Sequence, residues 1–160
     1  MKLLQFSFLL SILCFLISCT QNTGENGSSA LANQLSADVS KGKQNIQEYQ
    51  ALRDSCFELI RSIKMTSSSQ GGEGIQKGRP MVEELFPFFQ AFEKHKQITT
   101  ELEALSNQLS SGQIPEAEVK KNYEAQKAAW QSTAEVLPSG AATYQKVKTT
   151  FLEVFPLPIK

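Results

Sequence analysis

The side chains best suited to nucleophilic or acid–base chemistry are few in this chain of 160 residues: one histidine, His95, and three cysteines, Cys14, Cys19 and Cys56. Nucleophilic catalysis needs a base within hydrogen-bond reach of the nucleophile and a third group that orients the base. His95 and Cys56 both fall on apolar stripes of expected helices, so they could pair only across an open cleft. We therefore expect a protein that is not an enzyme, and a hydrolase is an alternative.

Metal and haem chemistry also find little support in the spacing of these residues. Carboxylate-bridged metal bundles use Glu-x-x-His on two helices, but the residue three before His95 is Phe92. A covalently bound haem would need Cys-x-x-Cys-His, and the sequence has no such motif. No metal or cofactor is expected, although a core histidine among aromatic side chains keeps a small-ligand or haem-binding helical bundle as an alternative.

Cys19 stands at the boundary between an apolar segment and a polar one. A single positive charge, Lys2, precedes residues 3–18, which carry no charge and few polar side chains. A transmembrane helix needs about 20 apolar residues, so this shorter run is typical of a cleaved export signal. The run ends in LISC, residues 16–19. This stretch resembles the lipobox of bacterial lipoproteins, which has an aliphatic residue, a tolerant position, a small residue and a cysteine.

The resemblance implies that residues 1–18 are removed as a signal peptide and that Cys19 is lipidated. In that family the cysteine thiol takes a diacylglyceryl group, and the new amino terminus is usually acylated as well. Two or three acyl chains hold a small domain on a membrane far more firmly than one chain does. Thr20 stands where an inner-membrane retention signal would typically have aspartate, so the resemblance favours the outer membrane of the cell envelope over the inner membrane.

Composition favours one domain behind a short tether. Residues 19–29 are expected to form a lipidated polar tether that spans roughly 17 Å as a random coil, and residues 30–160 a single domain. The whole chain carries 16 basic and 16 acidic side chains. This balance gives no basic face for nucleic acid and no polybasic patch that would add electrostatic membrane binding.

Apolar residues recur at three- and four-residue steps from position 30 onward, which predicts an all-α domain. We expect helices over residues 30–65, 80–110 and 115–155, the second of them starting near Pro80. The Ser- and Gly-rich residues 66–79 are expected to form a solvated loop. At 1.5 Å per residue the helices span roughly 54, 46 and 60 Å. Such comparable lengths favour an up-down-up three-helix bundle.

The third arm keeps one register across an interruption at Pro138-Ser139-Gly140. Large apolar side chains recur there every seven residues: Tyr123, Trp130, Leu137, Tyr144 and Phe151. Nothing would require this phase to continue if the chain reversed, so the register favours a kinked or broken third arm. A chain reversal at the interruption would instead give a four-helix bundle, which is the alternative architecture.

Seven-residue spacing also places Cys56 and His95 on the apolar stripes of their helices. We predict a buried, unreactive thiol at Cys56 and a hydrogen-bonded core or rim histidine at His95. Gly42, on the same stripe as Cys56, should weaken its helix by about 1 kcal/mol relative to alanine and could mark a kink.

Apolar side chains around residues 85–92 exceed what one helical face can bury. Phe86 and Phe89, with Val82, lie off the stripe that Phe88 and Phe92 continue. A covering segment would make the off-stripe residues structural, whereas exposure would make them a docking patch, because contiguous exposed apolar surface usually marks a binding site. Val82, Phe86 and Phe89 are therefore the possible partner-binding residues.

These features predict a membrane-anchored envelope lipoprotein that acts by binding. We expect a protein-interaction or structural module, attached to the membrane through Cys19, with a protein partner in the cell envelope and no nucleic acid. The sequence of the mature domain, residues 30–160, shows no resemblance to a known family.

Overall fold

The computed structural model describes residues 25–156, which form four α-helices. They are α2 (Glu25–Ser69), α3 (Gly71–Ser110), α4 (Glu116–Val136) and α5 (Ser139–Val154). No β-strand occurs in this part of the chain, so the all-α prediction is confirmed. The predicted signal peptide, Cys19 and Thr20 lie outside the described residues. None of the helices between residues 25 and 156 has the length and hydropathy of a membrane span.

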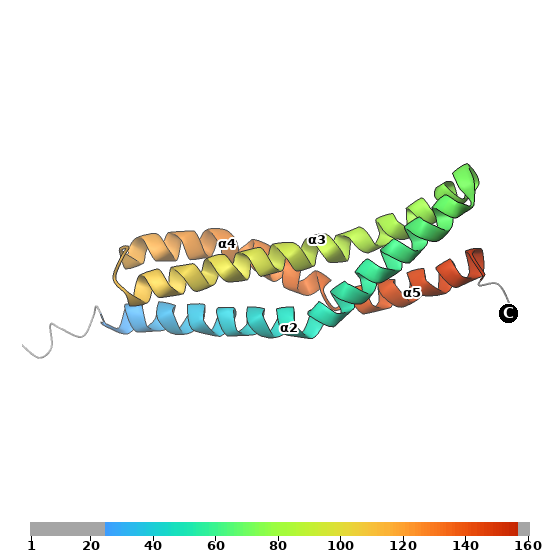
Figure 1. Cartoon of the computed structure of the whole chain (residues 1–160). Coiled ribbons are helices and arrows are strands. Elements are labelled where there is room, and N and C mark those ends of the chain that lie inside the picture. Colours follow the sequence, from blue (N-terminus) through green and yellow to red (C-terminus); the bar gives the residue numbers. More distant parts are fainter. Residues whose placement is uncertain (1–24, 157–160) are drawn as a thin grey trace, which may run out of the picture.

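The helices form an elongated bundle in which α2 and α3 are a long antiparallel hairpin (Figure 1). α4 and α5 follow one another along this hairpin, α4 beside the beginning of α2 and α5 beside its end. The core divides accordingly into two clusters. The proximal cluster takes side chains from α2, α3 and α4, and the distal cluster, nearer the turn between α2 and α3, takes them from α2, α3 and α5. The predicted bundle with a broken third arm is confirmed, and its helix number is that of the four-helix alternative.

The break in the third arm lies at Pro138, which cannot donate a backbone hydrogen bond. Gly140 N donates to Leu137 O at 3.1 Å, which closes the turn between α4 and α5. Gly140 is buried against Phe88, and a Cβ atom at position 140 would lie 2.6 Å from Phe88 Cε2. The third arm can therefore approach α3 here because residue 140 has no side chain.

The seven-residue register continues across this break, as predicted. Four of its members are buried and Tyr144 is half-buried; the buried ones are Tyr123, Trp130, Leu137 and Phe151. One side of the third arm thus faces the hairpin along its whole length.

The predicted loop over residues 66–79 is wrong, because both long helices continue into this segment. A single residue, Gln70, separates α2 from α3. Ser67 and Gly78 are buried where the helices meet, and a Cβ atom at Gly78 would lie 2.8 Å from Ser67 Cβ. Small side chains let the helices pack closely here, and this packing outweighs the low helix propensity of serine and glycine.

α3 also passes through two prolines, so the expected start near Pro80 is wrong. Pro80 and Pro87 both lie inside α3, which begins at Gly71. Each proline leaves one carbonyl of the preceding turn without its usual N–H donor. The buried face of α3 compensates for this loss by packing against α2 and α5.

Candidate functional site

Large apolar side chains are exposed in only one half of the part of the chain that the structure describes. Six of them are more than a third exposed: Phe57, Met65, Ile75, Phe86, Leu152 and Val154. All six come from the stretches of α2, α3 and α5 that surround the distal cluster. The distal half of the bundle therefore carries the apolar surface that a binding partner could cover.

A groove between α2 and α3, called the α2–α3 groove, runs along this half and encloses about 290 Å³. Its lining comes from these two helices alone: Ile63, Lys64, Ser67, Ser68, Ile75, Gly78, Arg79, Val82, Glu83 and Phe86. Ile63 and Val82 are buried, whereas Ile75 and Phe86 are 50% and 44% exposed. The groove thus has apolar side chains at its floor and on its walls.

A second depression, called the α2 depression, adjoins the groove on the outer face of α2. It measures about 280 Å³ and is lined by Phe57, Ile60, Arg61, Lys64 and Met65. Lys64 lines both hollows. The Arg53 guanidinium lies 5.8 Å from the ring centre of Phe57 on α2 and 6.0 Å from that of Phe89 on α3. These contacts connect the apolar side chains of the two helices into one surface.

The three residues that the sequence proposed for partner binding lie in different environments. Phe86 is exposed and lines the α2–α3 groove, and Phe89 is half-buried beside Arg53. Val82 is 7% exposed, belongs to the distal cluster and lines the floor of the groove, so of the two alternatives that the sequence left open, the covered one applies to its side chain. The reason is that α3 contacts α2 on one side and α5 on another, so its buried surface is wider than one stripe.

Sequence reasoning missed the contribution of α2 to this surface. Phe57 and Met65 are 53% and 65% exposed, yet both lie in a helix whose apolar stripe was assigned to the core. The position of Phe57 directly after Cys56 was a usable signal, because adjacent residues on a helix point about 100° apart.

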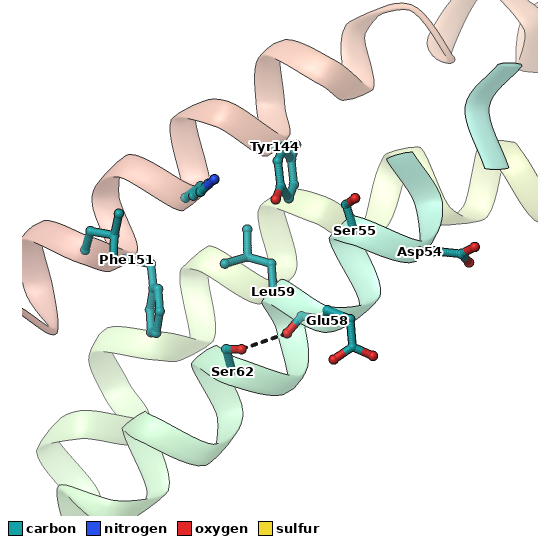
Figure 2. A pocket seen from close by; sticks show the side chains of 9 residues that line it. Asp54, Ser55, Glu58, Leu59, Ser62, Tyr144 and Phe151 are labelled. Atoms are coloured by element: carbon teal, nitrogen blue, oxygen red, sulfur yellow. Dashed lines mark hydrogen bonds between the residues drawn. The ribbon is translucent and has the colours of Figure 1, made fainter. Parts of the chain in front are cut away.

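On the other side of α2, a cleft separates it from α5 (Figure 2). It measures about 510 Å³ and is lined by Asp54, Ser55, Glu58, Leu59, Ser62, Tyr144, Lys148, Phe151 and Leu152. Ser55 Oγ donates to Ala51 O and Ser62 Oγ to Glu58 O, each at 2.9 Å. Both hydroxyls are therefore engaged with their own helix, and the cleft offers mainly apolar contact at Leu59 and Phe151.

His95 is completely buried and hydrogen-bonded, as predicted. Thr133 Oγ1 donates to Trp130 O at 2.7 Å, so at 2.9 Å it accepts a hydrogen bond from His95 Nδ1. The network assigns the proton to Nδ1, and Nε2 then accepts from Asn45 Nδ2 at 3.3 Å. Burial lowers the pKa of His95, which favours the neutral ring.

These contacts leave His95 little freedom for other chemistry. Its ring stacks on Trp130 with 5.3 Å between ring centres, and both nitrogens are engaged, so a haem iron could reach Nε2 only by displacing Asn45. Cys56 is fully buried in the distal cluster, and burial raises the pKa of its thiol to about 11. The thiol is therefore protonated at neutral pH and is a poor nucleophile. Within residues 25–156, no three His, Cys, Asp or Glu side chains gather where they could share a metal ion.

A polar cleft lies between α2 and α4 in the proximal half and measures about 560 Å³. Its lining includes the two residues that contact His95 from either side, Asn45 and Trp130, together with Asp38 and Tyr49. Asp38 Oδ2 accepts a hydrogen bond from Tyr123 Oη at 2.6 Å. Aromatic rings and polar groups therefore meet here, as they do in sites for small polar ligands.

No family model, curated protein or solved structure matches this chain. We therefore infer its function from the geometry of the chain itself.

Proposed function

We propose that this chain is a lipid-anchored protein of the bacterial cell envelope that binds a partner protein through its distal half. One observation carries the proposal: all six exposed large apolar side chains of the described residues lie in that half. Four of them, Phe57, Met65, Ile75 and Phe86, border two adjoining hollows, and contiguous exposed apolar surface usually marks an interaction site. The two hollows joined at Lys64 give this surface a shape into which a partner could fit.

The position of the anchor supports this arrangement. α2 begins at Glu25, six residues after Cys19. With 45 residues, α2 is about 68 Å long. A lipid on Cys19 would therefore hold one end of the bundle at the membrane and leave the distal half accessible to a partner. Thr20, in the position after the anchor, favours the outer membrane in this proposal.

Binding is favoured over catalysis because the two reactive side chains are engaged in the core. His95 is hydrogen-bonded to Asn45 and Thr133, and Cys56 is buried in the distal cluster. Neither His95 nor Cys56 lines the α2–α3 groove or the α2 depression.

A photo-crosslinking amino acid in the full-length chain tests the proposal in intact cells. We would place it at Phe86 or Met65 in the distal half, and at Gln34 or Lys120 as controls that are exposed in the proximal half. The distal positions should yield a crosslinked protein and the proximal positions should not. Similar yields in both halves, or none at the distal positions, would contradict the proposal.

A second candidate function, the binding of a small ligand, is favoured by the polar cleft between α2 and α4. Trp130 lines this cleft and is the only tryptophan of the chain, so tryptophan fluorescence reports on the cleft and on the proximal cluster beside it. A ligand bound there should change that fluorescence, and Asn45→Ala should weaken the change. Haem addition gives a separate test, because coordination of the haem iron by His95 Nε2 would shift the Soret band and would require His95 to leave Asn45.

A further inference from the structure

We propose that the α2–α3 groove and the α2 depression receive an amphipathic helix of a different protein, with apolar side chains on its inner face and a carboxylate opposite Lys64. This inference rests on the proposed function, since it names the kind of partner that the distal half binds.

One side of the α2–α3 pair is filled in the distal half and the other is open. On the filled side, α5 contributes Val147 and Phe151 to the distal cluster. On the open side every lining residue comes from α2 or α3. Phe86 lies two positions before Phe88 and so about 200° around α3, away from the side where Phe88 meets Gly140. The distal half therefore has room for one more helix, which would complete a four-helix arrangement.

The groove suits a helix better than an extended segment. A helix satisfies its own backbone hydrogen bonds, whereas an extended peptide gains affinity mainly by pairing with the edge of a sheet. Residues 25–156 contain no strand that could offer such an edge. Phe57 in the depression and Ser68 in the groove lie about 17 Å apart along α2. That length accommodates about three turns of a partner helix, which would anchor itself at positions i, i+3 or i+4, and i+7.

The charges around the two hollows indicate an acidic partner. Lys64 is the charged residue that both hollows share. Arg79 is paired with Glu83 at 2.7 Å, and Arg61 lies 3.9 Å from Glu58. Across the described residues, Lys64 makes no ion pair. A carboxylate of the partner could pair with Lys64, while apolar side chains of the partner contact the groove and the depression on either side of it.

The same charge disfavours a second copy of this chain as the occupant. A symmetric dimer brings the same surface patch of both subunits together, so each Lys64 would approach a patch in which the one unpaired charge is the other copy's Lys64. The carboxylates nearest the hollows, Glu83 and Glu58, already have partners on their own chain. A different, acidic protein fits this surface better.

The first step of the test identifies the occupant in cells that carry the full-length chain. A photo-crosslinking amino acid at Ser68, which is exposed and lines the groove, should join one protein. Carbodiimide treatment of the same cells should then form an amide bond between Lys64 Nζ and a carboxylate of that protein. Mass spectrometry of the joined peptides should place this carboxylate in a segment with apolar residues at helical spacing.

Two variants of Lys64 separate the effect of its positive charge from the reactivity of its amine. Lys64→Arg keeps the charge but lacks the amine, so the photo-crosslink should persist and the carbodiimide product should disappear. Lys64→Glu should lower the photo-crosslink yield about tenfold, because it opposes the partner's carboxylate. Lys120→Glu, at an exposed proximal position, makes the same charge change and should leave the yield unaltered.

Each other outcome overturns the inference in a distinct way. A product of twice the mass of the chain would show self-association instead, and a product with lipid would show contact with a membrane surface. A protein joined at Ser68 without a carboxylate near Lys64 would overturn the acidic helix and leave the proposed function standing. No product at Ser68, Met65 or Phe86 would overturn both.

Discussion

Gly42 of α2 lies directly against Thr99 of α3, so closely that a Cβ atom at position 42 would come within 2.6 Å of Thr99 Cγ2. Thr99 is only 1% exposed, and its Oγ1 accepts a hydrogen bond from Trp130 Nε1 at 3.2 Å. Thr99 therefore cannot rotate away from position 42 without losing that bond. A glycine that the sequence indicated as a weak point of its helix is a point of close approach between α2, α3 and α4.

We expect Gly42→Ala to lower the free energy of unfolding by about 1–3 kcal/mol, the usual cost of overpacking a core. Helix propensity alone predicts the opposite sign, a gain of about 1 kcal/mol. Gly72→Ala is the matched control, because a Cβ atom there meets nothing within 4 Å; it should be neutral or stabilising. Urea unfolding followed by circular dichroism distinguishes the two, and equal effects would contradict the close contact at Gly42.

His95 makes the stability depend on pH in a definite direction. Burial lowers its pKa below the ordinary value of 6.5, so the unfolded chain binds a proton that the folded chain excludes. The stabilising contribution is therefore complete above about pH 6.5 and is lost as the pH falls from there through the folded pKa. We expect the free energy of unfolding to decrease between about pH 7.5 and pH 5.5.

His95→Gln provides the comparison for this prediction. The side chains in contact with His95 are Asn45, Thr133 and Trp130. None of them is charged, so the substitution removes the one titrating group among these four residues. The variant should be less stable at about pH 7.5 and should lose less stability on acidification. Urea unfolding at both pH values measures the effect, and an equal decrease in both proteins would show that other groups cause it.

Cys56 should react slowly with thiol reagents in the folded protein. Its side chain is fully buried, and burial raises the pKa of the thiol to about 11. A reagent therefore cannot reach the sulfur easily, and little of the reactive thiolate is present at neutral pH. In a chain with Cys14→Ser and Cys19→Ser, an aromatic disulfide reagent should label Cys56 rapidly only in urea. Cys56→Ala should cost about 1–2 kcal/mol of stability. Rapid labelling of the folded chain would mean that this part of the core opens readily.

The anchor prediction concerns Cys19. With Cys19→Ala the thiol that carries the lipid is absent, and the chain should move from the detergent phase to the aqueous phase in phase partitioning. The variant also lacks the cysteine of the lipobox, and an uncut apolar segment would itself partition into detergent, so the comparison uses only molecules from which residues 1–18 have been removed. A variant that was processed normally and stayed in the detergent phase would contradict the lipoprotein proposal.

Seven-residue spacing predicted the packing of the third arm because that arm meets the hairpin along one side. Tyr123 and Leu137 are fully buried and Trp130 is 4% exposed. The same reasoning left the burial of Val82 open, and Val82 is buried because α3 is flanked by two helices in the distal half and buries more than one stripe. A single-stripe rule cannot say which off-stripe residues a second neighbour will cover.

Composition could not predict the turn between α2 and α3. Serines and glycines over residues 66–79 are typical of a loop, yet Ser67 and Gly78 serve as small contact residues between two helices. That role depends on how closely the helices approach, which is a tertiary property. The distal surface was predictable only in part. The pattern of α3 identified Phe86, but Phe57 joins this surface only because α2 packs beside α3, which the sequence does not show.

Val82→Ala and Phe86→Ala should separate the core from the docking surface. Val82 is 7% exposed, so its truncation should cost about 1–2.5 kcal/mol, whereas Phe86 is 44% exposed and its truncation should cost less than about 1 kcal/mol. Thermal unfolding should therefore show a clearly lower melting temperature for Val82→Ala and a shift of at most a few degrees for Phe86→Ala.

Crosslinking from Ser68 supplies the second measurement for this pair. Exposed aromatic anchors contribute disproportionately to binding, so Phe86→Ala should reduce the crosslink yield strongly while the protein stays folded. Val82→Ala, assayed well below its melting temperature, should retain most of the yield, because Val82 supports the groove from beneath. Phe86→Ala that unfolds as early as Val82→Ala would instead make Phe86 a core residue, and the partner would then have to bind through Phe57 and Met65 on α2.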